Sequence, residues 1–89
     1  MLVISMFYGL IVAMYYLAIK QHKLPHIHVM YGELEAVYEI PNGNVLEGSL
    51  PSNKERLVQA WIEIHKEDLM ANWQLAVGGN RIFTIDPLK

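Results

Sequence analysis

The stretch from Pro25 to Ile40 alternates apolar and polar residues with a period of two, and the alternation breaks once, at Gly32-Glu33. Such alternation is typical of strands that bury one face. Glycine at the first position of a two-residue loop accepts the positive φ angle of a type II′ turn. The sequence therefore predicts a β-hairpin with its turn at Gly32-Glu33. The predicted cross-strand pairs are Tyr31 with Leu34, Met30 with Glu35, Val29 with Ala36, His28 with Val37, Ile27 with Tyr38, and His26 with Glu39.

This register sorts the side chains of the hairpin into two faces, because successive residues of a strand point to opposite sides. The apolar face comprises Ile27, Val29, Tyr31, Leu34, Ala36, Tyr38 and Ile40. The outer face comprises His26, His28, Met30, Glu35, Val37 and Glu39. The outer face holds the cluster of titratable side chains whose mutual geometry the sequence defines, and it is the candidate functional site.

Length and composition restrict the class of protein. With 89 residues the chain is expected to form a single domain, residues 1–89, whose small core makes oligomerisation a natural supplement. Apolar residues make up 53% of the chain and charged residues 18%, which favours a buried partner surface and argues against disorder. The absence of cysteine excludes disulfides, thiol catalysis and cysteine-ligated zinc. The net charge of −2 and the scattered basic residues do not indicate a nucleic-acid partner.

The segment Leu2–Ile19 carries no charged residue, so its length meets the requirement for a transmembrane helix or an uncleaved signal sequence. Its strand-forming residues and the possible turn at Tyr8-Gly9 favour two soluble strands instead, Leu2–Phe7 and Leu10–Leu17. Both strands are apolar on both faces. One face can pack against a helix, and a second sheet, a loop or another subunit must cover the other. We therefore expect no membrane span, and a homodimer or a complex with another small protein through residues 2–17.

The connection that follows the first hairpin, residues 18–24, reads as a polar loop in which His22 lies in solvent. After the second hairpin, Pro41-Asn42-Gly43-Asn44 is a turn signal and residues 45–50 form a short strand. The simplest register turns Glu47 toward the core. A bulge at the turn that shifts the register by one instead buries Leu46 and Leu50, and we prefer that arrangement.

A long helix is predicted after this strand. Ser52 and Glu55 have the spacing of a capping box, and Gly78-Gly79 marks the end. The apolar stripe of the helix comprises Leu57, Val58, Trp61, Ile62, His65, Leu69, Trp73 and Ala76, with His65 as a core or boundary residue. Asp68 and Asn72 interrupt the stripe, which suggests that the last turns bend or leave the core, and residues 81–85 are a possible edge strand. The predicted fold is α+β, an antiparallel sheet of four to five strands packed against one long amphipathic C-terminal helix.

Two chemical interpretations compete with a simple solvated or interface face at the candidate site. In the first, His26 and His28 hold a divalent metal such as zinc together with Glu35, because imidazoles two residues apart on a strand share a face. In the second, His26 and His28 act with Glu39 as acid and base in a small hydrolase of the ribonuclease kind. Phosphate could then be bound by Lys20, Lys23 or Arg81. No cofactor other than a metal is expected.

Several motifs agree in order and spacing with a known family. They are Val3-Ile4-Ser5-x-Phe7-Tyr8-Gly9, Met14-Tyr15-Tyr16, Pro25-His26-x-His28-x-x-Tyr31-Gly32-Glu33-x-Glu35-Ala36, Leu46-Glu47-Gly48-x-Leu50-Pro51, Trp61-x-x-x-His65 and Asn72-Trp73. Over nearly the whole chain, the sequence resembles a family of small prokaryotic proteins known as domain of unknown function 4160. One departure is that Leu24 and Ile27 stand where the family has proline and an aromatic residue.

The resemblance implies a soluble, cytoplasmic, single-domain protein. It also implies a gene that lies beside that of another small protein, in an arrangement like that of toxin–antitoxin pairs. It carries over no activity. Our leading functional hypothesis is therefore an interaction protein that forms one half of a two-protein module, and the alternatives are the small hydrolase and the metal-binding protein.

Overall fold

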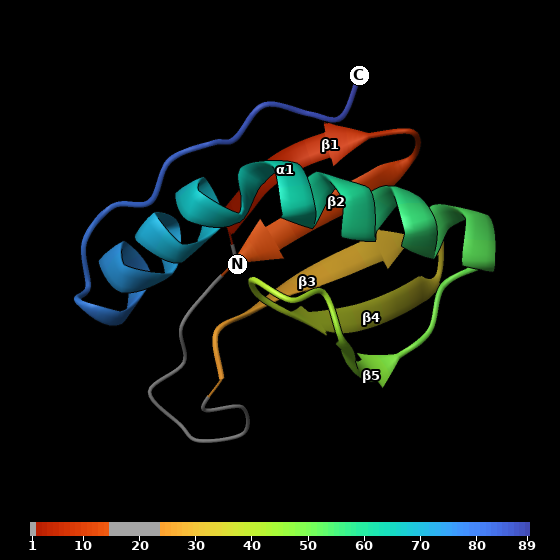
Figure 1. Cartoon of the computed structure of the whole chain (residues 1–89), viewed down its shortest axis with the longest axis horizontal. Helices are drawn as coiled ribbons and strands as arrows, with labels where there is room; N and C mark the ends of the chain where they lie inside the picture. The colour runs from red at the N-terminus through yellow and green to blue at the C-terminus, as the bar shows by residue number, and fades with distance from the viewer. Residues whose placement is uncertain (1, 15–23) are drawn as a thin grey trace.

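The computed structural model describes residues 2–14 and 24–89, and within them the chain forms one antiparallel sheet and one long helix (Figure 1). The five strands lie in the sheet in the order in which they occur along the chain. The α+β fold predicted from the sequence is confirmed. The elements are β1 (Leu2–Phe7), β2 (Leu10–Met14), β3 (His26–Tyr31), β4 (Leu34–Glu39), β5 (Val45–Gly48) and α1 (Ser52–Val77).

The central hairpin, β3–β4, has the predicted register at all six cross-strand pairs, from Tyr31 opposite Leu34 to His26 opposite Glu39. Gly32 has a φ angle of 61°, which is the positive value that the first position of a type II′ turn requires. The division into faces is confirmed at Ile27 and Tyr38, which are fully buried. It is wrong at Leu34, which lies beside the turn and is 47% exposed.

The first hairpin, β1–β2, confirms that the N-terminal segment forms strands. Tyr8 and Gly9 both have positive φ angles, 50° and 80°, as in a type I′ turn. The ladder is irregular between Val3 and Ser5, which adds one residue to β1 relative to β2. Residues 15–17 of the predicted second strand lie outside the described residues, as does the predicted loop at residues 18–23 with His22. Across the described residues, no helix is long and apolar enough to cross a membrane.

Strand β5 contains the predicted bulge, but within the strand rather than at the turn. Val37 pairs with Glu47, as the register shifted by one requires, whereas Tyr38 pairs with Val45. Leu46 is therefore the additional residue on β5, and it is half-buried rather than buried. The following Leu50 is buried, as predicted.

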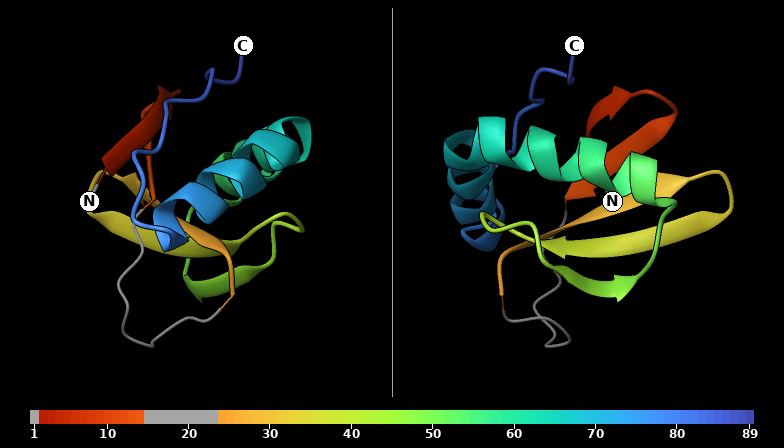
Figure 2. Two further views of the ribbon diagram at one scale, coloured as in Figure 1. Left: turned by 90° about the vertical axis from the view of Figure 1, so that its left-hand side faces the viewer. Right: turned by 45° about the vertical axis from the view of Figure 1, so that its right-hand side comes forward.

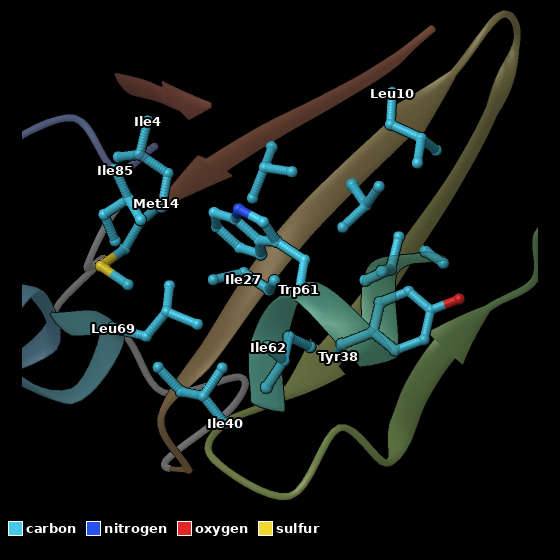
Figure 3. Close-up of a cluster of buried hydrophobic side chains, with 14 of the residues drawn as sticks. Ile4, Leu10, Met14, Ile27, Tyr38, Ile40, Trp61, Ile62, Leu69 and Ile85 are labelled. Atoms are coloured by element: carbon cyan, nitrogen blue, oxygen red, sulfur yellow. The ribbon is translucent and has the colours of Figure 1, made fainter. Parts of the chain in front are cut away.

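Helix α1 lies across one face of the sheet, and its apolar stripe forms the core with the inward residues of the strands (Figures 2 and 3). Trp61 is fully buried at the centre of this layer, with its ring centroid 5.4 Å from that of Phe7. The helix bends at His65, whose backbone angles (φ −111°, ψ 20°) are not helical. The second part of the helix therefore runs in a different direction from the first, in agreement with the bend suggested by Asp68 and Asn72.

The start of the helix differs from the predicted capping box. Pro51 occupies the N-cap position, and its carbonyl group accepts hydrogen bonds from the backbone N–H groups of Lys54 and Glu55 at 2.9 Å each. Ser52 is already the first residue of the helix, so its hydroxyl does not cap. Glu55 instead accepts a hydrogen bond from the Tyr38 hydroxyl at 2.9 Å, because that face of the helix packs on β4.

The C-terminal segment, residues 80–89, contains no strand, contrary to the prediction for residues 81–85. It runs back along β1, as Figure 1 and the left view of Figure 2 show. In the described part of the chain, a single backbone hydrogen bond joins the two, from the N–H of Ile85 to the carbonyl of Ile4 at 2.8 Å. The segment is held mainly by side chains of α1, which keeps its backbone from forming a regular ladder with β1.

Candidate functional site

The candidate site lies on the face of β3 and β4 that points away from α1. Register places His26 directly opposite Glu39, and His28 opposite Val37, as predicted. The two imidazole rings lie side by side, with ring centroids 5.2 Å apart. The sequence thus predicted correctly which residues share this face.

His26 is more enclosed than a solvated face would allow. Its Nδ1 atom lies 2.8 Å from the carbonyl oxygen of Leu24, and its ring centroid lies 5.0 Å from that of Trp73. Only 8% of the residue is exposed, so the expectation of a simply solvated face is wrong for His26. The reason is the bend of α1, which brings Trp73 to the end of the sheet. Because a carbonyl oxygen can only accept, the Nδ1 atom of His26 is assigned the proton, and this N–H donates a hydrogen bond to the carbonyl oxygen of Leu24.

His28 contacts the carboxylate of Glu35, and the two side chains form an ion pair only when the imidazole is protonated. Its Nδ1 atom lies 3.2 Å from Oε2 of Glu35, which stands diagonally across the ladder. The imidazole side chain is 12% exposed and the carboxylate 54%, so this is a partly screened pair of about 0.2–1 kcal/mol. The Nε2 atom of His28 is buried. Both ring nitrogens therefore face protein rather than open solvent.

This geometry bears differently on the two chemical interpretations. A metal ligand commonly donates one ring N–H to a backbone carbonyl, as His26 does, and binds metal through the other nitrogen. However, no group of three or more His, Asp and Glu side chains within residues 2–14 and 24–89 is arranged to hold a metal ion. A catalytic base must reach its substrate; the Nε2 atom of His28 is buried, whereas its Nδ1 atom contacts the exposed carboxylate of Glu35. Lys20 and Lys23, two of the predicted phosphate-binding groups, lie outside the described residues. The third, Arg81, lies at the start of the C-terminal segment.

Sequence reasoning missed two polar contacts that organise the core. The Tyr38 hydroxyl donates to Glu55, and burial, with a further contribution from this carboxylate, raises the pKa of the Tyr38 phenol well above its usual range. Asn72 is fully buried and binds both backbone groups of Phe83 with its amide. The signal for the second contact was present in the sequence, because an asparagine inside an apolar stripe requires a polar partner.

The model of one protein family, Domain of unknown function (DUF4160), matches residues 9–74, about three quarters of the chain. The chain belongs to the DUF4160 family. No curated protein and no solved structure was found to match it. The DUF4160 match includes β2 to β5, both histidines of the candidate site and most of α1. Strand β1 and the C-terminal segment, which contact each other, lie outside the matched residues.

A second feature of this DUF4160 protein is an exposed apolar surface on the first hairpin. Phe7 and Leu10 form a cross-strand pair that is buried under α1, so the next pair, Met6 and Ile11, points away from the helix. Met6 itself is 62% exposed. We name this region the N-terminal apolar surface, and it comprises Val3, Met6 and Ile11 together with Tyr8 of the turn, all exposed. Leu2 is exposed as well, but it pairs with Met14 on the side of α1.

The N-terminal apolar surface is continuous with the candidate site. Met6 pairs with Ile11, Ile11 with Met30, and Met30 with Glu35, so one cross-strand row runs from β1 to β4. This row begins with apolar side chains and ends at the carboxylate that contacts His28. An apolar centre that passes into a polar border is the composition of a protein–protein interface.

Proposed function

We propose that this protein is an interaction protein, one half of a two-protein module of the toxin–antitoxin kind. It binds its partner, or a second copy of itself, through the N-terminal apolar surface. The observation that carries the proposal is the exposure of that surface, since large contiguous apolar patches on a soluble domain mark interaction sites.

The position of the surface supports this function. Helix α1 covers the opposite face of the hairpin, so the outward row from Met6 through Ile11 to Met30 is available to a partner without any rearrangement of the core. His28 and Glu35 then form a polar contact at the end of the row, where a partner's polar groups can bind. In this function the histidines contribute specificity rather than chemistry.

The decisive experiment is expression of the full chain alone and together with the product of the adjacent gene, scoring growth and co-purification. We expect a stable complex. Met6→Lys places a charge at the centre of the apolar surface and should lower the co-purified partner at least about tenfold, because a buried unpaired charge in an interface costs several kcal/mol. Growth of the cells that express one protein without the other identifies which member of the pair is toxic.

Ile64→Lys is the matched control, because Ile64 is 64% exposed, like Met6, but lies on α1. This variant should retain the partner. Retention of the partner by Met6→Lys, or equal loss in both variants, would contradict the proposal. Sedimentation velocity of the chain alone, with the same two variants, separates self-association from binding of a different protein.

The hydrolase and metal-binding alternatives both require His26 and His28 to act on something outside the domain. Each predicts a result that the interaction hypothesis does not. A hydrolase loses toxicity or nuclease activity in His26→Ala, and a metal-binding protein shows joint NMR shifts of both histidines when Zn²⁺ is added. If neither effect is observed, the two histidines belong to the interface border.

A further inference from the structure

The C-terminal segment, residues 80–89, is bound to the rest of the domain as a peptide ligand is bound to a receptor. It lies along β1 and the bent part of α1 (Figures 1 and 2). Its hydrogen bonds run from Asn72 Nδ2 to the Phe83 carbonyl (2.8 Å), from the Phe83 N–H to Asn72 Oδ1 (2.9 Å), from Trp61 Nε1 to the Asp86 carbonyl (2.7 Å), and from the Ile85 N–H to the Ile4 carbonyl (2.8 Å).

These contacts demand little of the segment's sequence. Each of the four hydrogen bonds uses a main-chain group of the segment, and any extended peptide offers the same groups. The side-chain requirement is strongest at Ile85, which is 6% exposed and packs in the core with Ile4 (Figure 3). Ile82 and Leu88 are half-buried and pack against the same core, so the receptor selects an extended backbone that carries spaced apolar side chains.

Strand β1 has pairing capacity that this segment does not use. Phe7 and Leu10 flank a two-residue turn, so their backbone groups bond to each other, and those of the neighbouring Met6 point to the outer edge. Within residues 2–14 and 24–89, the segment makes one backbone hydrogen bond to β1. A depression of about 320 Å³ lies between the two, lined by residues 3–6 and 84–87. The edge of a six-residue strand is thus largely open.

We infer that the groove formed by the edge of β1, Trp61 and Asn72 is a binding site for an extended apolar strand of the partner protein. The C-terminal segment is the internal ligand that this strand displaces. The incoming strand can form a regular ladder along β1 and take over the side-chain hydrogen bonds, which is β-strand addition. The inference rests on the proposed function for the source of the strand, but the groove can be tested without that partner.

The test uses the ¹⁵N-labelled full chain with Ile85→Asp, and a synthetic peptide of residues 80–89 as the probe. Loss of the buried isoleucine should release the segment, and the Trp61 indole N–H resonance should move because it loses the Asp86 carbonyl. Adding the peptide should return this resonance to its wild-type position. In the wild-type chain the same peptide should leave this resonance unmoved, because the chain's own segment already supplies the Asp86 carbonyl at a millimolar effective concentration.

The matched control is the same peptide carrying Ile85→Asp, which should leave the Trp61 resonance unmoved. If Ile85→Asp prevents folding, Ile85→Ala replaces it in the chain and weakens the segment with a smaller change. A folded variant whose indole resonance stays at the wild-type position would overturn the inference. So would equal effects of the two peptides.

Three further outcomes separate this inference from the proposed function. If the wild-type chain is a dimer that dissociates in Ile85→Asp, the groove takes the segment of a second copy, and the assignment to a partner strand is wrong. If a partner co-purifies through Met6 but the peptide fails to bind, only the groove is wrong. If the peptide binds and no partner or self-association is found, the proposed function fails while the groove stands.

Discussion

The two edges of the sheet differ in how they prevent or permit pairing with another strand. Strand β5 has four residues, carries Glu47, and contains an irregularity that disrupts its ladder. Short length, charge and bulges are the features by which sheets prevent pairing at an edge. Strand β1 also has an irregular ladder, between Val3 and Ser5, but it has six residues and no charge, and it exposes Leu2, Val3 and Met6. Length and charge therefore make β5 the closed edge, and we expect a partner strand at the edge of β1.

The candidate site on β3 and β4 can be placed relative to these two edges. The central hairpin, β3–β4, lies between the two edges and carries the histidine pair. The apolar row from Met6 to Met30 extends from that hairpin toward β1, while the acidic Glu47 lies toward β5. The following predictions test the two sides of the sheet, from the largest expected effect on stability to the smallest.

The closed edge depends on Gly48. Its φ angle is 71°, and a Cβ atom there would overlap the carbonyl oxygen of Glu35 and touch the Cα atom of Ala36. Gly48→Ala should therefore lower the free energy of unfolding by about 3 kcal/mol or more, from backbone strain and steric overlap together. Gly32→Ala is the control, because Gly32 also has a positive φ angle but open space around its Cα. It should cost about 1–2 kcal/mol, and equal losses in urea unfolding would show that the close approach is unimportant.

The C-terminal segment beside the open edge depends on Asn72. Asn72→Leu keeps the volume but leaves the N–H and carbonyl of Phe83 without their amide partner, which should cost about 2 kcal/mol. Thermal or urea unfolding measures this loss. Gln74→Leu, at an exposed position on the same helix, should change stability by less than about 0.5 kcal/mol. If both variants unfold alike, Asn72 does not hold the segment.

The sequence was sufficient for the local parts of this fold. The alternation around Gly32 determined the register of β3 and β4, because a slip of one residue would turn Ile27 and Tyr38 to the outer face. The extent of α1 followed from its apolar stripe and from Gly78-Gly79. The site residues shared a face for the same reason, so His26, His28, Glu35 and Glu39 could be grouped without a structure.

The remaining features depend on contacts between distant segments. The bend at His65 sets where Trp73 lies, and so determines the burial of His26, which no local pattern encodes. The capping-box spacing was present, but Glu55 binds Tyr38 of a distant strand instead. The C-terminal segment reads as a strand, yet Asn72 binds its backbone and competes with a ladder on β1. Each error has the same cause, a tertiary contact that overrides a local preference.

Tyr38 joins β4 to the helix and gives a prediction about pH. Its folded pKa is raised by burial and by its hydrogen bond to Glu55, whereas an unfolded tyrosine ionises near pH 10. Above pH 10 the unfolded state therefore binds fewer protons than the folded state, so this contribution to stability is complete below pH 10 and falls as the pH rises, by up to about 1.4 kcal/mol per pH unit.

Tyr38→Phe should cost about 1 kcal/mol at neutral pH, through the lost hydrogen bond, and should reduce the slope of stability between pH 10 and 11. Ile62→Val costs a similar amount in the core without removing a titratable group, so it should keep the wild-type slope. Unfolding curves at several pH values compare the three chains. A slope in Tyr38→Phe equal to that of the wild type would show that Tyr38 is not the responsible group.

The smallest effects on folding are expected on the exposed side chains of the two edges. Met6→Lys in β1 and Val45→Lys in β5 should each change the free energy of unfolding by less than about 0.5 kcal/mol, because both side chains are exposed in the single chain. Their effects on association should differ, since only Met6 belongs to the N-terminal apolar surface. A large loss of stability in Met6→Lys, measured for the monomeric chain, would mean that Met6 supports the fold rather than an interface.

The most direct test of the central claim is hydrogen exchange at the two edges, measured for the chain alone and in the complex that co-purifies with it. The register of β1 and β2 points the backbone N–H of Met6 to the outer edge. We predict that its exchange slows at least about tenfold in the complex, while the amides of β5 exchange at unchanged rates. Slower exchange in β5 with no change at Met6 would contradict the account, because the partner would then bind at the edge that the fold closes.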